Sequence, residues 1–365
     1  MTDIVKVSDI IKKINSIADP GLALEWDNVG LQVGSSEAEV SKIMLTLDVT
    51  EKAVEFAIAR NVDLIISHHP LIFHSLKSVT DSKLLNLIKH DIAVFCAHTN
   101  LDVVKKGVNF ALAEKLQLHN LDFLSPETGA ELFQISVYVP QDSMDLLAEE
   151  LFKQGVGVVG NYTHCLNDYE VSGQYKPEKG SNPYLGEKGK LRKITERKLE
   201  FFVDSFNLSS VIATIKKFHP YETPVYSIVP QKRMSDNYGL GLIGEIKQEI
   251  SIAELALEVK NKLEAPYVKL WLAQKSRSTQ VKKIAICGGS GSSLLKSTYG
   301  RADIFISADF TYHTVLESRI PLIDAGHFYT EYPVLEQLKS VLICKELEII
   351  EFPRTQHEIN QQIIL

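Results

Sequence analysis

The stretch Asp63-Leu-Ile-Ile-Ser-His-His-Pro-Leu-Ile-Phe-His74 joins a short apolar run to two adjacent histidines and a proline. Neighbouring side chains on a β-strand point to opposite faces of a sheet. Two adjacent imidazoles can therefore serve one site only where the strand ends. Pro70 stops this strand, since proline cannot continue a central strand. The pattern predicts a buried strand whose carboxyl end presents His68 and His69 together.

Five further apolar runs have the same character. They are short, rich in isoleucine, leucine and valine, and continuous rather than alternating, as expected for strands covered on both faces. The six predicted strands are 42–48, 63–67, 92–97, 283–287, 303–307 and 320–324. Helix-like segments lie between them, for example residues 50–61, which begin with a threonine suited to cap a helix. Strands and helices in alternation predict an α/β layered sheet.

The middle of the chain breaks this rhythm. Its strand-like segments are 133–139, 198–203 and 225–229, and its helix-like segments are 142–154 and 208–218. With a polar, glycine- and proline-rich stretch between them, the order resembles β-α-(β-β)-α-β, which is typical of a ferredoxin-like α+β unit. We therefore expect an inserted domain at 131–236 within a two-part α/β body formed by 1–130 and 237–365. The insert has about 100 residues, a size typical of an independent domain.

Composition limits the classes of partner. The chain has 365 residues, 45% hydrophobic and 23% charged, and its net charge is −7 without a block of lysines and arginines. These values suit a globular protein and argue against nucleic-acid binding, which needs a basic surface. No apolar run approaches the roughly 18 residues needed to cross a bilayer, and the first residues lack the apolar region of a signal peptide. We expect a cytoplasmic protein without a membrane partner.

Two more predicted strands end in residues suited to bind metal. The strand at 92–97 leads into His98-Thr-Asn-Leu-Asp102, and the strand at 320–324 leads into Ala325-Gly-His-Phe-Tyr-Thr-Glu331. Because ligands of open α/β sheets bind beyond the carboxyl ends of the strands, these side chains are expected to meet the first pair. His327 and Glu331 stand one helical turn apart if the backbone coils there. A helix that starts at Pro333 would instead leave both in the preceding loop.

The expected metal ligands are His68, His69, Asp102, His327 and Glu331. Nitrogen and carboxylate donors without thiolate suit zinc, iron or manganese. Five ligands are too many for one ion that keeps an open position, and they suit two ions that share a bridging carboxylate. Glu331 is the predicted bridge, because a glutamate can give one oxygen to each ion.

Three other residues are expected beside these ligands. His98 is either a further ligand or a partner of one. Asp309 and His313 follow the strand at 303–307 and are predicted to line the same cleft, as partners of ligands or as acid-base groups. Each motif also has a plain structural interpretation: a capped strand end for His-His-Pro, an Asx turn for 98–102, and a polar helix start for 327–331. Their coincidence at three equivalent strand ends favours the metal site.

Several other segments have two interpretations. Cys287-Gly-Gly-Ser-Gly-Ser-Ser293 is interpreted as a tight turn with a serine cap, with anion binding as the alternative. Residues 26–34 form either a structural turn or a wall of the site. The polar loops of the insert are interpreted as turns and inter-subunit surface, with a small-ligand pocket as the alternative; they are 155–165, 182–186 and 219–222.

Taken together, the motifs resemble the Nif-three-like family, whose members are often named GTP cyclohydrolase 1 type 2 homologues. The segments that carry the resemblance are 26–34 (WDNVGLQVG), 67–73 (SHHPLIF), 98–102 (HTNLD), 287–291 (CGGSG), 307–313 (SADFTYH) and 325–331 (AGHFYTE). The likeness spans the whole chain, and the insert resembles the PII-like domain of the longer bacterial members. It implies a two-metal centre at the same five ligands and a ring-shaped homohexamer. Ser307-Ala-Asp309 departs from the Thr-Gly-Asp that is common in the family.

The function expected from these features is that of a hydrolase-like protein with two divalent ions per chain, zinc in first place and iron or manganese as alternatives. Metal-activated water would attack a nucleotide or a related small substrate, with GTP ring opening as the reaction that the resemblance implies. His98, Asp309 or His313 would relay protons. The alternative is a non-enzymatic metal-binding regulator or scaffold whose insert senses a ligand.

Overall fold

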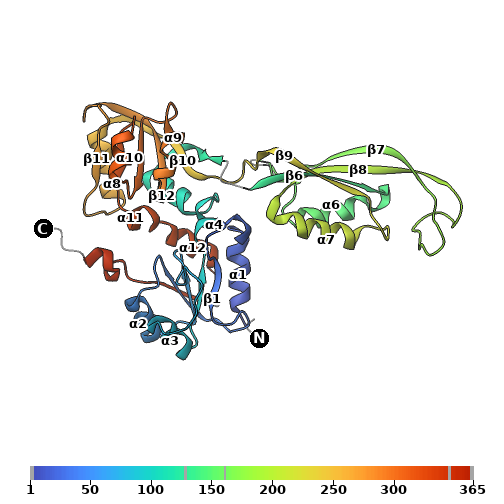
Figure 1. The fold of residues 1–365 in the computed structure, drawn as a ribbon, viewed down its shortest axis with the longest axis horizontal. Helices are drawn as coiled ribbons and strands as arrows, with labels where there is room; N and C mark the ends of the chain where they lie inside the picture. Colours follow the sequence, from blue (N-terminus) through green and yellow to red (C-terminus); the bar gives the residue numbers. More distant parts are fainter. Residues whose placement is uncertain (1–3, 127–129, 160–161, 344–346, 362–365) are drawn as a thin grey trace. The chain divides into compact units, whose positions relative to one another are not determined.

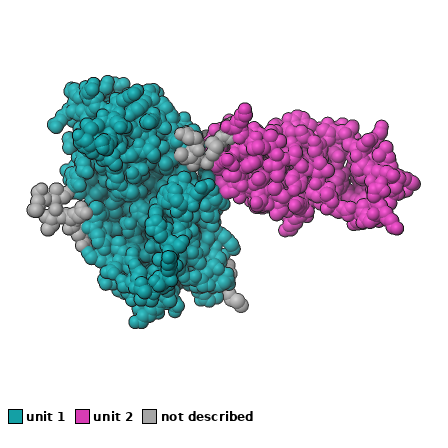
Figure 2. Space-filling model, viewed as in Figure 1, with its two compact units in different colours: residues 1–128, 238–365 teal, residues 129–237 magenta. Residues whose placement is uncertain are grey.

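Three β-sheets with helices packed against them make up the part of the chain that the computed structural model describes, residues 4–126, 130–159, 162–343 and 347–361 (Figure 1). The chain divides into two compact units. One contains residues 1–128 and 238–365, and the other contains residues 129–237 (Figure 2). The fold is thus mixed α/β, with the larger unit built from two segments that are far apart in the sequence.

The first sheet of the larger unit contains the strand that ends in the paired histidines. Its strands, in spatial order, are β1 (Gly30–Val33), β4 (Ala93–Cys96), β3 (Leu64–Ser67), β2 (Lys42–Thr46) and β15 (Glu348–Glu351). All neighbours run parallel except β1, which is antiparallel to β4. Leu64, Ile65 and Ile66 are fully buried, which explains why this strand is apolar on both faces.

Helices connect the parallel strands. α2 (Glu51–Ala59) leads from β2 to β3, and α3 (Ser82–Lys89) leads from β3 to β4. The Thr50 hydroxyl accepts a hydrogen bond from the Ala53 amide at 3.3 Å and so caps α2. The predicted helix at 50–61 is present, with its end two residues earlier.

The second sheet carries the other three predicted strands. Its strands, in spatial order, are β11 (Lys269–Trp271), β14 (Leu322–Asp324), β13 (Ile304–Ala308), β12 (Gln280–Ser290), β10 (Leu240–Ser251) and β5 (His119–Ser125). β12, β13 and β14 are parallel, and the others pair antiparallel. The helices between the strands of this sheet, or directly after its last strand in the chain, are α8 (Ile252–Lys262), α9 (Leu295–Thr298), α10 (Tyr312–Glu317) and α11 (His327–Glu331).

The segment before the insert and the segment after it each give an edge strand to the sheet that the other segment mainly forms. β5 precedes the insert but pairs with β10, and β15 lies near the carboxyl terminus but pairs with β2. Two helices between the sheets, α5 (Val108–Leu116) and α12 (Val334–Leu342), contact each other, and α5 also contacts β12 while α12 contacts β2. α1 (Val7–Asn15) packs on α12, and α4 (Thr99–Asp102) follows β4. The two sheets therefore belong to one unit and are joined by these helices.

The smaller unit has the order β-α-β-β-α-β. Its elements are β6 (Glu131–Val139), α6 (Met144–Phe152), β7 (Asn167–Tyr175), β8 (Arg192–Asp204), α7 (Leu208–Phe218) and β9 (Tyr226–Met234). The sheet is antiparallel with the order β7-β8-β6-β9. Both helices cover the same face of it (Figure 1), over a core that includes Val137, Phe201 and Ile215.

Strand β7 lies in the polar stretch where the sequence does not locate a strand. Its residues are exposed or half-buried along its whole length, so neither face supplies the apolar alternation that indicates a strand. None of the described helices is both long enough and apolar enough to span a bilayer.

Candidate metal centre

Side chains from three strand ends and from both sheets meet at one place in the larger unit. Glu331 on α11 lies at the middle of the group. Its Oε2 is 3.0 Å from His69 Nε2, and its Oε1 is 3.0 Å from His327 Nε2 and 3.7 Å from His68 Nε2. Asp102 Oδ1 lies 3.6 Å from His68 Nε2. The structure thus brings together all five residues that the sequence predicts as ligands.

The backbone after β14 explains how His327 and Glu331 come to face the same way. Residues 327–331 form the short helix α11, so the two side chains lie one turn apart on one face. Gly326 precedes them with φ +83°, a conformation that favours glycine. Pro333 does not start this helix; it is the N-cap residue of the next one, α12. The backbone therefore coils at the position where the sequence left two possibilities open.

Four histidines of the group are oriented in the same manner. Each ring has its Nδ1 within hydrogen-bond distance of an acceptor oxygen, which leaves Nε2 to face the group. The pairs are His68 with Ala97 O (2.9 Å), His69 with Asp48 Oδ1 (2.8 Å), His98 with Asp27 Oδ1 (2.9 Å) and His327 with Asp309 Oδ2 (2.5 Å). Metal-binding histidines almost always have such a partner, because it fixes the tautomer and the direction of the ring.

His98 also lies in the group, with its ring close to those of the predicted ligands His68 and His69. Its ring centroid lies 5.2 Å from that of His68 and 5.5 Å from that of His69. The side chains of His68, His69 and His98 offer ligand atoms within 4.8 Å of one another, as do those of His69, His327 and Glu331. His69 is shared by the two sets, which therefore lie next to each other. We call His68, His69, His98, Asp102, His327 and Glu331 the candidate metal centre.

Unpaired polar atoms in the centre fit a metal ion. His68 Nε2, Asp102 Oδ1 and Glu331 Oε2 are buried and have no hydrogen-bond partner among the described residues. The 3.0 Å approach of Glu331 Oε2 to His69 Nε2 is that of an ion pair, without the geometry of a hydrogen bond. Leaving a buried polar atom unpaired costs about 1–3 kcal/mol. Three such atoms that converge are therefore best explained as donors to a cation.

The pKa shifts show that the centre attracts positive charge. Burial opposes the charge of Glu331, but the imidazoles around it hold its pKa well below the usual range. Burial likewise opposes protonation of His69, yet the hydrogen bond with Asp48 and the adjacent carboxylate of Glu331 raise its pKa to about 10. His327 behaves in the same way, with Asp309 and Glu331 raising its pKa to about 10. A metal ion would take the place of these protons.

Comparison with known proteins identifies the family. The family model for Duf34/NIF3 (NGG1p interacting factor 3) matches residues 5–358. The chain belongs to the Duf34/NIF3 family. A Bacillus subtilis (strain 168) relative named "GTP cyclohydrolase 1 type 2 homolog" is 36% identical over 337 residues, which is 90% of each chain. A Staphylococcus aureus (strain N315) relative with the same name is 34% identical over 347 residues, 93% of each chain.

Solved structures of the family have the same fold. A Bacillus cereus protein related to NIF3 superposes with a TM-score of 0.85 at 30% identity, over 100% of each chain. A Staphylococcus aureus protein superposes with a TM-score of 0.74 at 29% identity, over 98% of this chain and 99% of that one. The resemblance stated from the sequence motifs is thereby confirmed.

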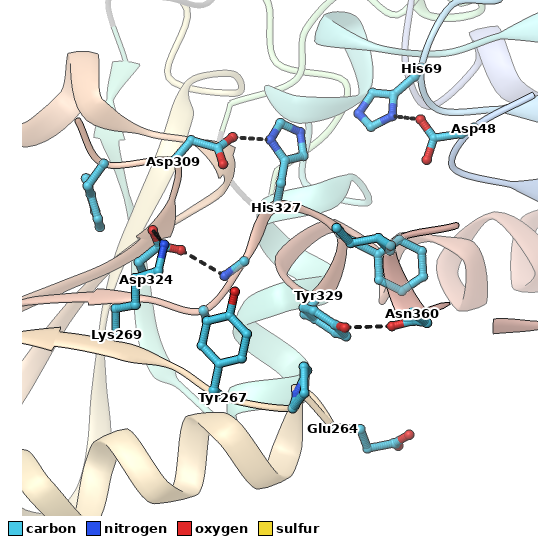
Figure 3. A pocket seen from close by; sticks show the side chains of 16 residues that line it. Asp48, His69, Glu264, Tyr267, Lys269, Asp309, Asp324, His327, Tyr329 and Asn360 are labelled. Atoms are coloured by element: carbon cyan, nitrogen blue, oxygen red, sulfur yellow. Dashed lines mark hydrogen bonds and ion pairs between the residues drawn. The ribbon is translucent and has the colours of Figure 1, made fainter. Parts of the chain in front are cut away.

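A cleft opens beside the centre of this NIF3-family chain (Figure 3). It has a volume of about 680 Å³, and its walls include His69, His327 and their partners Asp48 and Asp309. Lys269 of β11 also lines the cleft, with Nζ 3.7 Å from Asp324 Oδ2. The cleft therefore combines one edge of the centre with a lysine.

Two glycines at the carboxyl end of β12 lie against the centre. Gly289 has φ +62°, and a Cβ there would lie 2.2 Å from Glu331 Oε1 and 3.1 Å from His327 Nε2. Its amide donates to the Thr330 hydroxyl at 3.0 Å, and the amide of Gly288 donates to Asn109 Oδ1 at 2.9 Å. These two amides are thus used within the chain. Strand β12 thus continues to Ser290, where a tight turn was expected, and its glycines leave room for the carboxylate of Glu331. Neither sequence interpretation of the segment included this role.

The other sequence-predicted residues lie in different surroundings. Asp309 is a partner of His327, as described above. His313 is exposed on α10, and among the described residues its ring contacts that of Tyr312. Trp26 has its ring centroid 6.1 Å from that of His98 and 5.7 Å from that of Phe73. Trp26 therefore lies beside the site, whereas residues 30–33 of the same segment form strand β1 and not a turn.

Two carboxylates of the site were missed from the sequence. Asp27 faces His98 and accepts hydrogen bonds from the amide and the hydroxyl of Thr99. Burial alone would raise the pKa of Asp27, but these hydrogen bonds outweigh burial and lower the pKa to about 2. Asp48 follows β2 as His68 follows β3. The rule that carboxyl ends of parallel strands meet at one edge, applied to the strand at 42–48, would have found it.

Proposed function

We propose that this protein is a hydrolase that holds two divalent metal ions per chain, zinc in first place and iron or manganese as alternatives. The proposed ligands are His68, His69, Asp102, His327 and Glu331. The observation that carries the proposal is the convergence of their donor atoms, three of them buried and unpaired. Glu331 is the proposed bridge, because Oε1 faces His327 and His68 while Oε2 faces His69.

The chemistry divides between the ions and the chain. Bound divalent ions lower the pKa of water and polarise the bond that is attacked. Asp48 and Asp309 hold the rings of His69 and His327 in the orientation that leaves Nε2 free to bind. His98 is held likewise by Asp27, and we assign to its Nε2 either a further metal bond or the transfer of a proton. No role is assigned to His313, which is exposed.

The proposed substrate is a nucleotide or a related small anion. Lys269 places a positive charge in the cleft beside His69 and His327, where it would attract phosphate. Trp26 offers an exposed aromatic ring next to His98, and Phe73 offers another next to Trp26. A planar base can stack on such rings. The relatives' name, GTP cyclohydrolase 1 type 2 homolog, makes GTP the first nucleotide to test.

Three further features are part of the proposal. The β-α-β-β-α-β order of residues 129–237 supports a PII-like inserted domain. The resemblance of the sequence motifs to the family supports a ring-shaped homohexamer, and the composition supports a cytoplasmic location. The alternative function is a metal-binding regulator, and a pocket in the insert, described below, favours it.

Metal analysis together with a hydrolysis screen tests the proposal. Purified protein reconstituted with zinc, iron or manganese should hold about two ions per chain and should turn over GTP or another nucleotide. Glu331→Gln should lose both properties. Glu317→Gln, the same chemical change on the exposed face of α10, should lose neither. Two bound ions without turnover of any nucleotide would favour the regulator, and no bound metal would overturn the site itself.

A further inference from the structure

The inserted unit contains a pocket of about 470 Å³ that the proposed function does not use. Its lining comes from strands β6, β7 and β8, from the loop after β7 and from the loop before β9. The last two include the motifs Asn182-Pro-Tyr-Leu-Gly186 and His219-Pro-Tyr-Glu222. The residues that carry the argument are Gly173, Tyr175, Tyr184, Glu196, Tyr221 and Glu222.

Three tyrosine rings surround one space. The ring of Tyr221 lies 6.1 Å from that of Tyr175 and 6.2 Å from that of Tyr184, at interplanar angles of 59° and 51°. Each hydroxyl is engaged. That of Tyr175 donates to Leu185 O at 2.7 Å, and those of Tyr221 and Tyr184 donate to carboxylates, Glu196 Oε1 at 2.8 Å and Asp142 Oδ2 at 3.2 Å. The rings are therefore held in place by their hydroxyls, which leaves their faces as the available surface.

The loop that carries Tyr221 is fixed at its start by His219. The ring of His219 is buried, with Nε2 2.7 Å from Tyr138 O, and Nδ1 accepts from the Tyr221 amide at 3.0 Å. Glu222 then accepts from the Asn182 amide at 3.0 Å. These contacts join the two loop motifs and place both at the same pocket, which gives them a common structural purpose.

The charged side chains among the described residues of the pocket are carboxylates. Glu196 is 9% exposed, and its Oε1 is engaged by Tyr221, while Oε2 has no partner among the described residues. Gly173 gives Oε2 its space, because a Cβ there would lie 2.8 Å from it. Glu222 adds a second carboxylate, and the described residues that line the pocket include no lysine, arginine or histidine. A carboxylate that is largely withdrawn from water attracts a cation that enters the pocket.

The surroundings decide which kind of cation fits. A metal ion needs several oxygen, nitrogen or sulfur ligands, whereas the tyrosine hydroxyls here are already bound to the chain. Aromatic faces next to a carboxylate are instead the arrangement that attracts alkylated ammonium groups, through cation–π interactions. A nucleotide or another anion would be repelled by Glu196 and Glu222. We propose that the pocket formed by Tyr175, Tyr184 and Tyr221 with Glu196, the tyrosine pocket, binds a small molecule that carries a trimethylammonium group.

A titration with a charged and a neutral probe of the same shape tests this proposal. The full-length protein is titrated calorimetrically with choline and, in parallel, with 3,3-dimethyl-1-butanol, in which carbon replaces the nitrogen. Choline should bind at least about tenfold more tightly, since the positive charge supplies the interaction with the rings and the carboxylate. Equal affinity for the two probes, or no binding of choline at millimolar concentration, would overturn the proposal.

Variants then test the assigned residues. Glu196→Gln keeps the shape and removes the charge, and Gly173→Ala places a methyl group against Glu196 Oε2. Tyr184→Leu removes one aromatic face of an exposed ring. Each should weaken choline binding by about tenfold or more while leaving the circular dichroism spectrum and the metal content unchanged. Tyr162→Leu, an exposed tyrosine of the same unit that does not line the pocket, is the matched control. Choline binding that survives all three pocket variants would place the ligand elsewhere.

Discussion

The candidate metal centre and the tyrosine pocket use carboxylates in different ways. In the metal centre most carboxylates orient imidazole rings, which in turn would bind the cation. In the tyrosine pocket a carboxylate and aromatic faces would contact the cation directly. Asp48 and Asp309 each direct a histidine toward the metal. Glu196 instead binds a tyrosine hydroxyl with one oxygen and leaves the other available. Both places concentrate negative charge out of water, and the donors beside that charge decide the cation. Directed nitrogen and oxygen atoms suit a metal, and aromatic faces suit an alkylated ammonium group.

The largest expected effect is that of Glu331→Gln, which replaces the carboxylate that faces three of the histidines by a neutral amide. The affinity for both ions should fall by more than about a hundredfold, beyond the loss caused by changing a partner of a ligand. Metal titration measures this. Choline binding should not change, and a loss of choline binding along with the metals would show that the two places are coupled.

Gly289→Ala should have the next largest effect. The added methyl group would meet Glu331 Oε1 at 2.2 Å, so at least one ion should be lost, as measured by elemental analysis. Gly300→Ala is the matched control, because Gly300 has a similar φ of +71° but open space around its Cβ position. It should cost only about 1–2 kcal/mol of stability for the left-handed backbone. Equal metal content in the two variants would contradict the close approach.

A smaller effect is expected when the hydrogen bond that orients the ring of His69 is weakened. Asp48→Asn keeps the size of the side chain but gives His69 Nδ1 a weaker and ambiguous partner. Metal affinity should fall by about 10–100-fold with the fold intact by circular dichroism. Asp122→Asn, at an exposed position of β5, should leave affinity unchanged. If the two variants bind metal alike, Asp48 does not position the ring.

The smallest effect concerns pH in the metal-free protein. The folded-state pKa values of His69 and His327, about 10, lie above the 6.5 of an unfolded histidine. Their stabilising contribution is therefore complete below pH 6.5 and is lost as the pH rises toward 10. The unfolding temperature of metal-free protein should fall across this window. The fall should be smaller in a His69→Gln, His327→Gln double variant, and an equal fall in both proteins would assign it to other groups.

Much of the body could be predicted because its signals are local. A strand such as 63–67 is apolar on both faces, so it is recognisable without knowledge of its neighbours. Its carboxyl end then marks His68 and His69. The division of the six strands between two sheets could not be predicted in this way, since nothing in a short apolar run specifies which strand it pairs with. β7 was missed for the opposite reason: as a largely solvated edge strand, it needs no apolar residues.

The parts of the site that depend on distant contacts were also missed. Asp27 and Asp48 acquire their roles only when β4 and β3 bring His98 and His69 beside them. Gly289 looks like an ordinary turn glycine until α11 is placed against it. The tyrosine pocket joins residues from 173 to 222, and no spacing rule connects them. Residue types at strand ends can therefore indicate ligands, but the groups that orient them emerge only from the assembled fold.

The exchanged edge strands have a consequence for the order of events during synthesis. β15 pairs with β2, which the ribosome releases about 300 residues earlier, whereas the inserted unit is complete within 129–237. The insert can thus reach its structure while the first sheet still lacks an edge and the ligands on α11 have not been made. Since unpaired edges invite association between chains, nascent chains released before residue 348 should aggregate through β2, whereas the insert within them should already resist protease.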